Sequence, residues 1–310
     1  MPKAALQNPV YTNEDAAREA LEAVRWPDGP ICPHCGNADQ EKIAKGAGKA
    51  TRPGLYYCAA CNGQFTVTVG TVMERSKIPI SKWLLAMHLM ASSKKGMSAH
   101  QLHRMLGVTY KSTWFMAHRI REAMTESNPT PMGGKGGQVQ ADETYYGNTS
   151  KRSKSYRKGL KRKEAVLGLV DPATGKARAF HMELGVGIPV VRDLIVKNAS
   201  RKSVLVSDES KLYAKLGKEF ADHQTMLHWC GEYVNKDGFT TNNVENFFGT
   251  FKRGMKGTYH FCGPQHLQRY LNEFSFRYSN RSGVGVEDGE RAALIAKGIG
   301  GKRLTYRPTH

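Results

Sequence analysis

The sequence contains no long apolar run. Its longest, from Trp83 to Ala91, is interrupted by His88 and is shorter than the roughly 20 apolar residues that a membrane-spanning helix needs. The first residues, Met1 to Pro9, also lack the apolar centre of a secretory signal peptide. These absences predict a soluble protein that acts in the cytoplasm and has no membrane partner.

Acidic residues are scarce relative to basic ones. The chain has 27 Asp and Glu against 46 Lys and Arg, which gives a net charge of +19 and a pI near 9.7. A positive field of this kind attracts polyanions and speeds encounter with them. Nucleic acid is the first candidate partner, because neutralisation of phosphates by Lys and Arg supplies most sequence-independent affinity. An acidic membrane surface is a weaker alternative, since no basic amphipathic anchor stands out.

Cysteines are few, and most of them follow one pattern. Four of the six form two Cys-x-x-Cys pairs with 22 residues between the pairs: Cys32, Cys35, Cys58 and Cys61. Because each pair can present two thiolates to one ion, the spacing predicts a closed, structural Zn²⁺ site. Two redox dithiols are the alternative, but they would need thioredoxin-like surroundings that are absent. His34, inside the first pair, is expected to shape the turn rather than to bind the metal.

Internal repeats and long low-complexity segments are also absent, so changes in pattern divide the chain. Residues 127–137, rich in Pro and Gly, form the clearest linker. The division predicts an N-terminal helix at 1–30, a zinc ribbon at 31–72, a helical DNA-binding segment at 79–126, the linker at 127–137, a mixed α/β domain at 138–282 and a C-terminal tail at 283–310.

The segment 79–126 has the pattern of helices joined by short turns. A turn at 107–109 separates a short helix, capped by Ser98, from a longer one over 110–124. This spacing suits a helix–turn–helix that contacts DNA, although such modules also serve only to pack against neighbours. The zinc ribbon is the other candidate for reading bases. Two polar positions on the last helix are candidate DNA contacts: Lys111 and Arg119.

After the linker the pattern changes to alternating strands and helices. We expect strands at 138–146, 165–170, 177–184, 203–206 and 224–229. Helices are expected at 188–199, 210–220, 242–256 and 264–279. Consecutive strands followed by alternating helices and strands predict one mixed sheet flanked by helices.

Three carboxylates lie in or beside apolar stretches of this domain. Asp142 is on the first predicted strand, Asp208 ends a later strand, and Glu245 is on a helix. They could converge on a pair of Mg²⁺ ions, which stabilise the attacking and leaving oxygens of a phosphoryl transfer. Three other acidic residues compete for these roles: Glu143, Glu164 and Glu209.

Basic residues accompany the carboxylates. Lys252 follows Glu245 by seven residues on the same helix face and could hold a phosphate near the metals, or could simply be solvated. A stretch without acids follows the first strand and could track DNA phosphates, although a charge run is often only a solvated loop. Its members are Lys151, Arg152, Lys154, Arg157, Lys158, Lys161, Arg162 and Lys163.

Motifs spread over residues 20–285 carry a family resemblance: Trp26-Pro27, Asp142-Glu143-Thr144-Tyr145, Ser207-Asp208-Glu209, Thr241 to Asn246, Lys252-Arg253-Gly254, Tyr259-His260 and Tyr270 to Tyr278. They resemble the DDE transposases of bacterial insertion sequences, in particular the ISXO-like group with an N-terminal zinc ribbon. The resemblance implies an RNase H-like domain in which Asp142, Asp208 and Glu245 form the triad that binds two Mg²⁺. It adds Arg253 to the expected DNA contacts, while His228, in another similar segment, is expected to be structural.

The combined features predict a transposase. It would cleave the 3′ ends of its element and transfer the resulting 3′-OH to target DNA. Its partners would be the terminal repeats and target DNA at the nucleoid, and synapsis of two ends requires at least a homodimer. One alternative is an RNase H-like nuclease without strand transfer. The other is a zinc-ribbon DNA-binding regulator with an inactive nuclease core, which the presence of all three carboxylates argues against.

Overall fold

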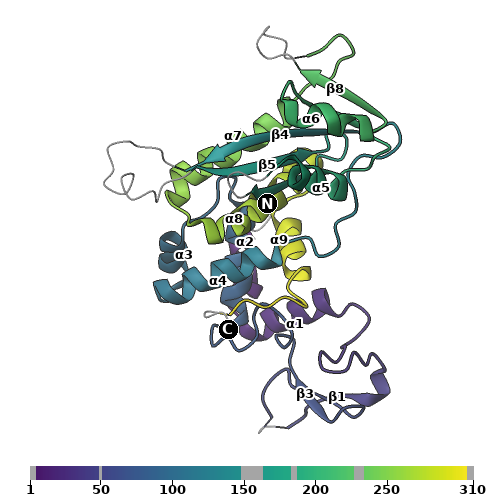
Figure 1. Cartoon of the computed structure of the whole chain (residues 1–310). Coiled ribbons are helices and arrows are strands. Elements are labelled where there is room, and N and C mark those ends of the chain that lie inside the picture. Colours follow the sequence, from purple (N-terminus) through teal and green to yellow (C-terminus); the bar gives the residue numbers. More distant parts are fainter. Residues whose placement is uncertain (1–4, 49–50, 148–162, 183–186, 227–233, 306–310) are drawn as a thin grey trace. The chain divides into compact units, whose positions relative to one another are not determined.

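Figure 1 shows the computed structural model of the chain, which describes residues 5–48, 51–147, 163–182, 187–226 and 234–305. The chain divides into two compact units. The first combines Met1–Thr125 with Glu287–His310, and the second comprises Glu126–Val286. Within the described ranges, no helix has both the length and the apolar character needed to cross a bilayer.

The helices of the first unit begin at side-chain caps that the sequence indicates. Asn13 accepts hydrogen bonds from two backbone N–H groups of the first turn of α1, and the Ser98 hydroxyl accepts one from the Gln101 N–H at the start of α3. Gly107 ends α3 in the left-handed conformation (φ 59°) and turns the chain toward α4. The bounds are α1 (Glu14–Arg25), α2 (Ile80–Ser92), α3 (Ala99–Leu106), α4 (Tyr110–Ala123) and α9 (Asp288–Lys297).

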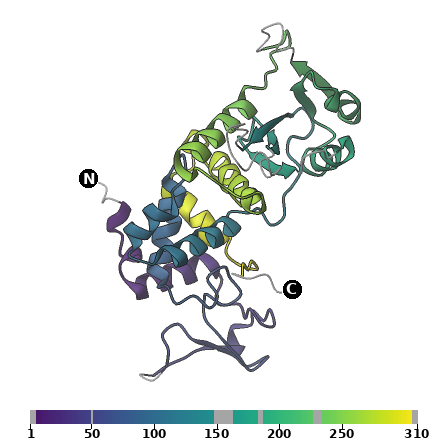
Figure 2. The same ribbon diagram turned by 60° about the vertical axis from the view of Figure 1, so that its left-hand side comes forward.

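Helix α9 comes from the segment that was expected to be a tail. It packs against α2 and also contacts α1 and α4 (yellow in Figure 2). The buried Arg291 guanidinium donates to the Ala91 carbonyl at 2.8 Å, and Ile295 is fully buried. At the end of α9, a side chain at Gly298 would clash with the Ala123 carbonyl oxygen, which lies 2.2 Å from the ideal Cβ position. The C-terminal residues therefore complete the core of the first unit.

A small antiparallel sheet carries the cysteine pairs. Its strands, in the order β1-β2-β3, are β1 (Ile43–Lys45), β2 (Tyr56–Cys58) and β3 (Gly63–Phe65). Its apolar centre consists of three aromatic rings: Trp26 meets Tyr56 and Phe65 edge-on, with centroids 5.4 and 5.8 Å away. So small a core needs an additional crosslink such as a metal to be stable.

The second unit contains the predicted mixed sheet. Its order is β6-β5-β4-β7-β8, with β4 antiparallel to β5 and parallel to β7. The strands are β4 (Gln138–Tyr146), β5 (Glu164–Val170), β6 (Ala177–Met182), β7 (Val204–Asp208) and β8 (Asp222–Met226). The helices are α5 (Ile188–Asn198), α6 (Lys211–Leu216), α7 (Asn242–Gly254) and α8 (Pro264–Ser279), and a π-helical turn (Met255–Tyr259) follows α7. The fold class predicted from the pattern is confirmed.

Each face of this sheet packs on different helices. Val139 and Ala141 of β4 belong to the core that contains residues of α5 and α6. Val166 and Val170 of β5 face the core formed with α7 and α8, the helices that Figure 1 draws in yellow-green. Because successive side chains of a strand alternate, Gln140 and its even-numbered neighbours on β4 face α7.

The segment expected as a linker is partly built into the second unit. Met132 is buried and forms a bridge with Ala199, with backbone hydrogen bonds to Asn198 and Ser200. Met132 thus ties this segment to the sheet domain ahead of β4.

Candidate active site and zinc centre

The four cysteine sulfurs converge as the spacing predicts. Their ligand atoms all lie within 4.8 Å of one another, with 3.6 Å between the sulfurs of Cys32 and Cys61 and 3.8 Å between those of Cys35 and Cys58. Four sulfurs at about 2.3 Å from a tetrahedral Zn²⁺ stand about 3.8 Å apart. The cluster therefore has the dimensions of a structural zinc site with all four ligands supplied by the chain.

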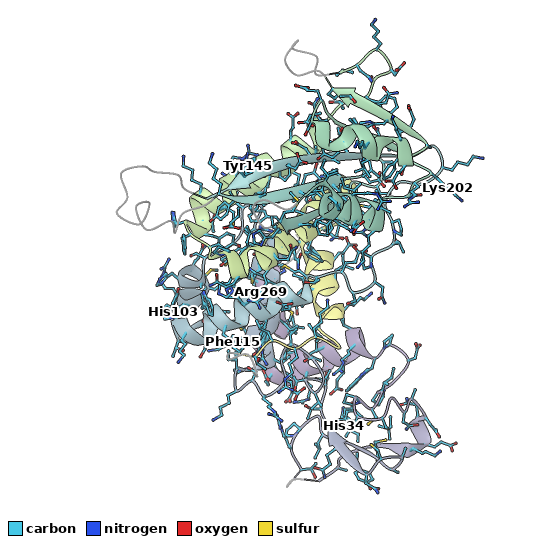
Figure 3. The ribbon with its side chains drawn as sticks, in the orientation of Figure 1. His34, His103, Phe115, Tyr145, Lys202 and Arg269 are labelled. Atoms are coloured by element: carbon cyan, nitrogen blue, oxygen red, sulfur yellow. The ribbon has the colours of Figure 1, made fainter. Side chains whose placement is uncertain are left out.

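Residues next to the cysteine cluster shape its surroundings and are not among the four ligands. The His34 ring, labelled in Figure 3, bonds the Gln64 carbonyl at 3.1 Å, which gives it a structural role in the turn. The Asn37 amide points at the Cys58 sulfur from 3.8 Å. Gly63 leaves little room for a side chain, because a Cβ there would lie 3.0 Å from the His34 ring and 3.1 Å from the Cys61 sulfur.

The thiols differ in acidity. Burial opposes ionisation of Cys32, but hydrogen bonds from the backbone of Cys35 and His34 outweigh it and lower its pKa to about 7. Contact with the Cys35 thiol raises the pKa of Cys61 to about 12. Thiolates are the species that bind zinc, so the lowered pKa of Cys32 favours the form of this thiol that acts as a ligand.

The two aspartates lie at the same level on neighbouring parallel strands. Gln140 of β4 pairs with Val206 of β7, and Asp142 and Asp208 are each two residues further along. Paired residues of parallel strands share a face, and the period of two carries that face forward. Both side chains are half-buried. The Asp142 carboxylate accepts from the Glu143 N–H at 2.7 Å, and that of Asp208 accepts from the Ser210 N–H at 3.1 Å.

Glu245 approaches this face through an anchor that sequence reasoning did not identify. The buried Gln140 side chain accepts from the N–H groups of Asn243 and Val244, both at 3.1 Å, and so caps the start of α7. Glu245 stands in that first turn, where the Thr241 hydroxyl donates to its carboxylate at 2.8 Å. A polar Gln two residues before Asp142 on a buried strand was the available signal.

Gly168 lets α7 approach the sheet beside Asp142. It pairs with Asp142 across β4 and β5. A Cβ at this position would lie 2.6 Å from Cζ of Phe248 and 3.2 Å from Cγ2 of Val244. The glycine therefore sets how closely the helix that carries Glu245 can pack.

Replacing Gly168 with Ala should push α7 away from β5. We expect the free energy of unfolding, measured with urea, to fall by about 1–3 kcal/mol, and metal-dependent DNA cleavage to fall further because Glu245 moves. Gly249→Ala, in the same helix, is the control: its new Cβ would meet only the end of the Arg253 side chain at 3.4 Å. That change should stabilise the protein by up to about 1 kcal/mol. Equal effects of the two changes would contradict the packing role of Gly168.

Glu143 faces the opposite side of the sheet, toward Tyr213. Burial raises the pKa of Glu143 to about 7, the Tyr213 hydroxyl opposes the shift, and Asp208 and Asp142 add to it. Tyr213 is fully buried, but its hydroxyl and Oε1 of Glu143 fall short of a hydrogen bond, and both lack a partner among the described residues. A half-buried carboxylate thus lies on the face of the sheet opposite to the two aspartates.

The carboxylates are not as tightly gathered as the cysteines. Within the described ranges, the four cysteines are the only group of three or more Asp, Glu, His or Cys with ligand atoms inside 4.8 Å of one another. The carboxylates of Asp142, Asp208 and Glu245 do not meet that limit. These three carboxylates nevertheless suit Mg²⁺ by their chemistry, because Mg²⁺ prefers oxygen ligands.

Two of the acidic residues that compete with the predicted triad, Glu164 and Glu209, have other surroundings. Glu164 is bonded across the strands to the ring of His181 at 2.7 Å. Glu209 is exposed just after β7.

The predicted DNA contacts fall into three groups. Lys111, Lys163, Lys252 and Arg253 are exposed. Arg119 is half-buried: it donates to the Glu74 carbonyl at 2.8 Å and stacks over the rings of Trp83 and Phe115. The remaining residues of the basic stretch, and also His228 and Cys230, lie outside the described residues: Lys151, Arg152, Lys154, Arg157, Lys158, Lys161 and Arg162.

Comparison with known proteins agrees with the two modules. A family model of the ISXO2-like transposase domain matches residues 135–279, and a model of the transposase zinc-ribbon domain matches residues 12–64. The second match includes α1, so this helix belongs with the ribbon in the family pattern. The two matches together cover well over half of the chain.

A relative supports the same assignment over most of the length. The chain is 24% identical over 281 residues to an uncharacterized protein in transposable element ISH50 of Halobacterium salinarum, which covers 86% of this chain and 91% of the relative. A simian T-cell lymphotropic virus intasome, solved in complex with the PP2A regulatory subunit B56 gamma, aligns at 14% identity over 56% of this chain and 63% of its own. Its TM-score of 0.30 is too low to bear on the fold. From the two family matches and the transposable-element relative, the chain belongs to the ISXO2-like transposases that carry a zinc ribbon.

Proposed function

We propose that this transposase cuts the ends of its element and joins them to target DNA at one DDE site formed by Asp142, Asp208 and Glu245. The observation that carries the proposal is the placement of Asp142 and Asp208 at one level on parallel strands, with the first turn of α7 tied to the same strand through Gln140. The family membership agrees with this chemistry.

Each residue has a distinct task in the proposed site. Asp142 and Asp208 hold two Mg²⁺ from the sheet, and Glu245 completes the set from the helix. When bound, the two ions stabilise the attacking and leaving oxygens of an in-line phosphoryl transfer. Lys252, exposed two helical turns after Glu245, holds a phosphate that flanks the cut. Thr241 fixes the Glu245 carboxylate so that it need not be ordered during the reaction.

The same proposal sets the partners and the state of assembly. The substrates are the terminal repeats of the element and a target duplex, reached in the cytoplasm at the nucleoid. Because two ends must be held together for joining, the active form on DNA is a dimer or larger. Zinc, held by the four cysteines, shapes the ribbon and takes no part in the chemistry.

The test is an assay of cutting and joining with the full-length protein. A labelled duplex carrying one end of the element is incubated with a supercoiled target in Mg²⁺, in Ca²⁺ or without added divalent ion. We expect Mg²⁺-dependent release of a 3′-OH at the element boundary, followed by its covalent joining to the target.

Two other outcomes identify the alternatives. Cleavage of generic or branched duplexes without joining would indicate a nuclease on the same fold. Binding to the ends with no cleavage in any metal would indicate a DNA-binding regulator. Either result would overturn the proposal, because both leave strand transfer unaccounted for.

A further inference from the structure

A groove in the first unit lies between the zinc ribbon and the helices. Its volume is about 1060 Å³, and its lining comes from α1, from the ribbon, from the segment that joins the ribbon to α2, and from the start of α2. The groove is separate from Asp142, Asp208 and Glu245, which belong to the second unit. The groove combines two elements that sequence patterns treat as separate DNA-reading modules.

The charges in the groove are mostly positive. Its lining contains Arg18, Arg52, Arg75, Lys77 and Lys82 against two acids, Glu14 and Glu74. Among the described residues, the side chains of Lys77 and Lys82 have no hydrogen-bond or ion-pair partner, and neither residue belongs to a strand.

Both acids have structural tasks. The Glu14 carboxylate accepts from the backbone N–H groups of Ile80 and Ser81 at 2.7 and 3.0 Å, so it caps the start of α2. The Glu74 carboxylate accepts from the Gly70 N–H at 3.1 Å and also pairs with the exposed Arg75 guanidinium at 3.7 Å. Because these acids are occupied by the fold, the lysines of the groove are left available for an external anion.

The segment that carries the cations is held firmly. Thr71 and Met73 in it are buried, and the Ser76 hydroxyl accepts from the Trp83 indole at 3.1 Å. Arg75 adopts a left-handed backbone conformation (φ 58°), which is uncommon for a residue with a Cβ, and its side chain is 81% exposed. Behind it, the half-buried Arg119 bonds the Glu74 carbonyl. A rigid loop presents its charges without a large loss of conformational entropy on binding.

We propose that this groove binds the backbone phosphates of double-stranded DNA through Arg75, Lys77 and Lys82. The choice of DNA as the polyanion rests on the proposed function. A duplex fits better than unpaired bases because the one aromatic ring of the lining, Trp83, is buried and offers no surface for stacking. In this arrangement Arg119 supports the loop that carries Arg75 and Lys77 and does not itself contact DNA. Its role thus differs from the DNA contact that the sequence predicts for it.

The test compares two double variants that each remove two charges. Lys77→Gln with Lys82→Gln changes the groove, whereas Lys94→Gln with Lys95→Gln changes two exposed lysines that follow α2 and lie outside the groove lining. Affinity for a fluorescent 40-base-pair duplex is measured by anisotropy at several salt concentrations without added Mg²⁺, so that no cleavage intervenes. Zinc content and thermal unfolding confirm that both variants are folded.

We expect the groove variant to lose at least about tenfold in affinity at 0.1 M salt, and the slope of log K against log salt to shrink by about 2. The control should change affinity by about twofold or less, since only the screened long-range field is altered. Arg75→Gln should shrink the slope by about 1. Equal effects of the two double variants, or an unchanged slope in the groove variant, would overturn the inference.

Binding without Mg²⁺ separates this inference from the proposed function. If the groove variant binds DNA normally while the wild type cuts and joins ends, only the proposal that the groove binds DNA is overturned. A groove that binds DNA in a protein that never cleaves would leave the groove in place and overturn the catalytic proposal.

Discussion

Replacing Asp142 with Asn should abolish cleavage and joining while leaving DNA binding intact. The change keeps the shape of the side chain but removes from β4 the negative charge that is proposed to bind Mg²⁺. We expect the rate of Mg²⁺-dependent cleavage to fall by about a thousandfold or more, which corresponds to about 4 kcal/mol in the activation barrier. Asp208→Asn should do the same, because the two aspartates stand at one level on neighbouring strands. The measurement is release of the 3′-OH product on a denaturing gel.

Asp193→Asn is the matched control. Asp193 lies on α5 with its side chain 74% exposed, and it pairs with Arg192 at the surface. A surface pair of this kind contributes little to stability, so cleavage should be unchanged. Full activity of Asp142→Asn would remove this residue from the catalytic site, and equal losses in Asp142→Asn and Asp193→Asn would point to a general effect of charge.

Replacing Cys58 with Ser should unfold the ribbon. Cys58 is fully buried, and its sulfur is one of the four that enclose the zinc position. Binding of structural zinc supplies about 10–16 kcal/mol in zinc-finger peptides, far more than three aromatic rings can contribute. We expect the bound zinc to fall from one ion per chain to none, and residues 31–65 to become sensitive to protease.

Cys262→Ser provides the control for the cysteine change. Cys262 is also buried, but it belongs to the core of the second unit between β5 and the helices α7 and α8. Its replacement should leave the zinc content and the protease resistance of the ribbon unchanged. Retention of one zinc ion by the Cys58 variant would show that the other three cysteines suffice and that the four-sulfur site is incorrect.

Local patterns predicted the parts of the fold that depend on neighbours in the chain. The Cys-x-x-Cys spacing specifies a knuckle wherever it occurs, so the zinc ligands follow from four residues. The strands expected at 138–146, 165–170 and 177–184 correspond to β4, β5 and β6. The strand β1, only three residues long, gave no such signal.

Contacts between distant residues could not be predicted in the same way. Gln140 caps a helix more than 100 residues later, and although a polar Gln on a buried strand signals a partner, it does not identify the helix that supplies it. Gly168 is explained by Phe248, which packs on it from α7. Arg119 has the spacing of an exposed residue of a DNA-reading helix, but Trp83 and the Glu74 carbonyl partly bury it. Each of these depends on tertiary packing rather than on local pattern.

The return of the chain through α9 has a consequence for folding during synthesis. The sheet domain has all of its residues by Val286, whereas the unit that begins the chain still lacks the helix that packs on α2. Domains generally fold as the ribosome releases them, at about 5–20 residues per second. Here the N-terminal unit is the last to finish. Until Arg291 and Ile295 arrive, the surface of α2 that they cover is exposed, and the nascent chain carries an open apolar face although its sheet domain is already complete.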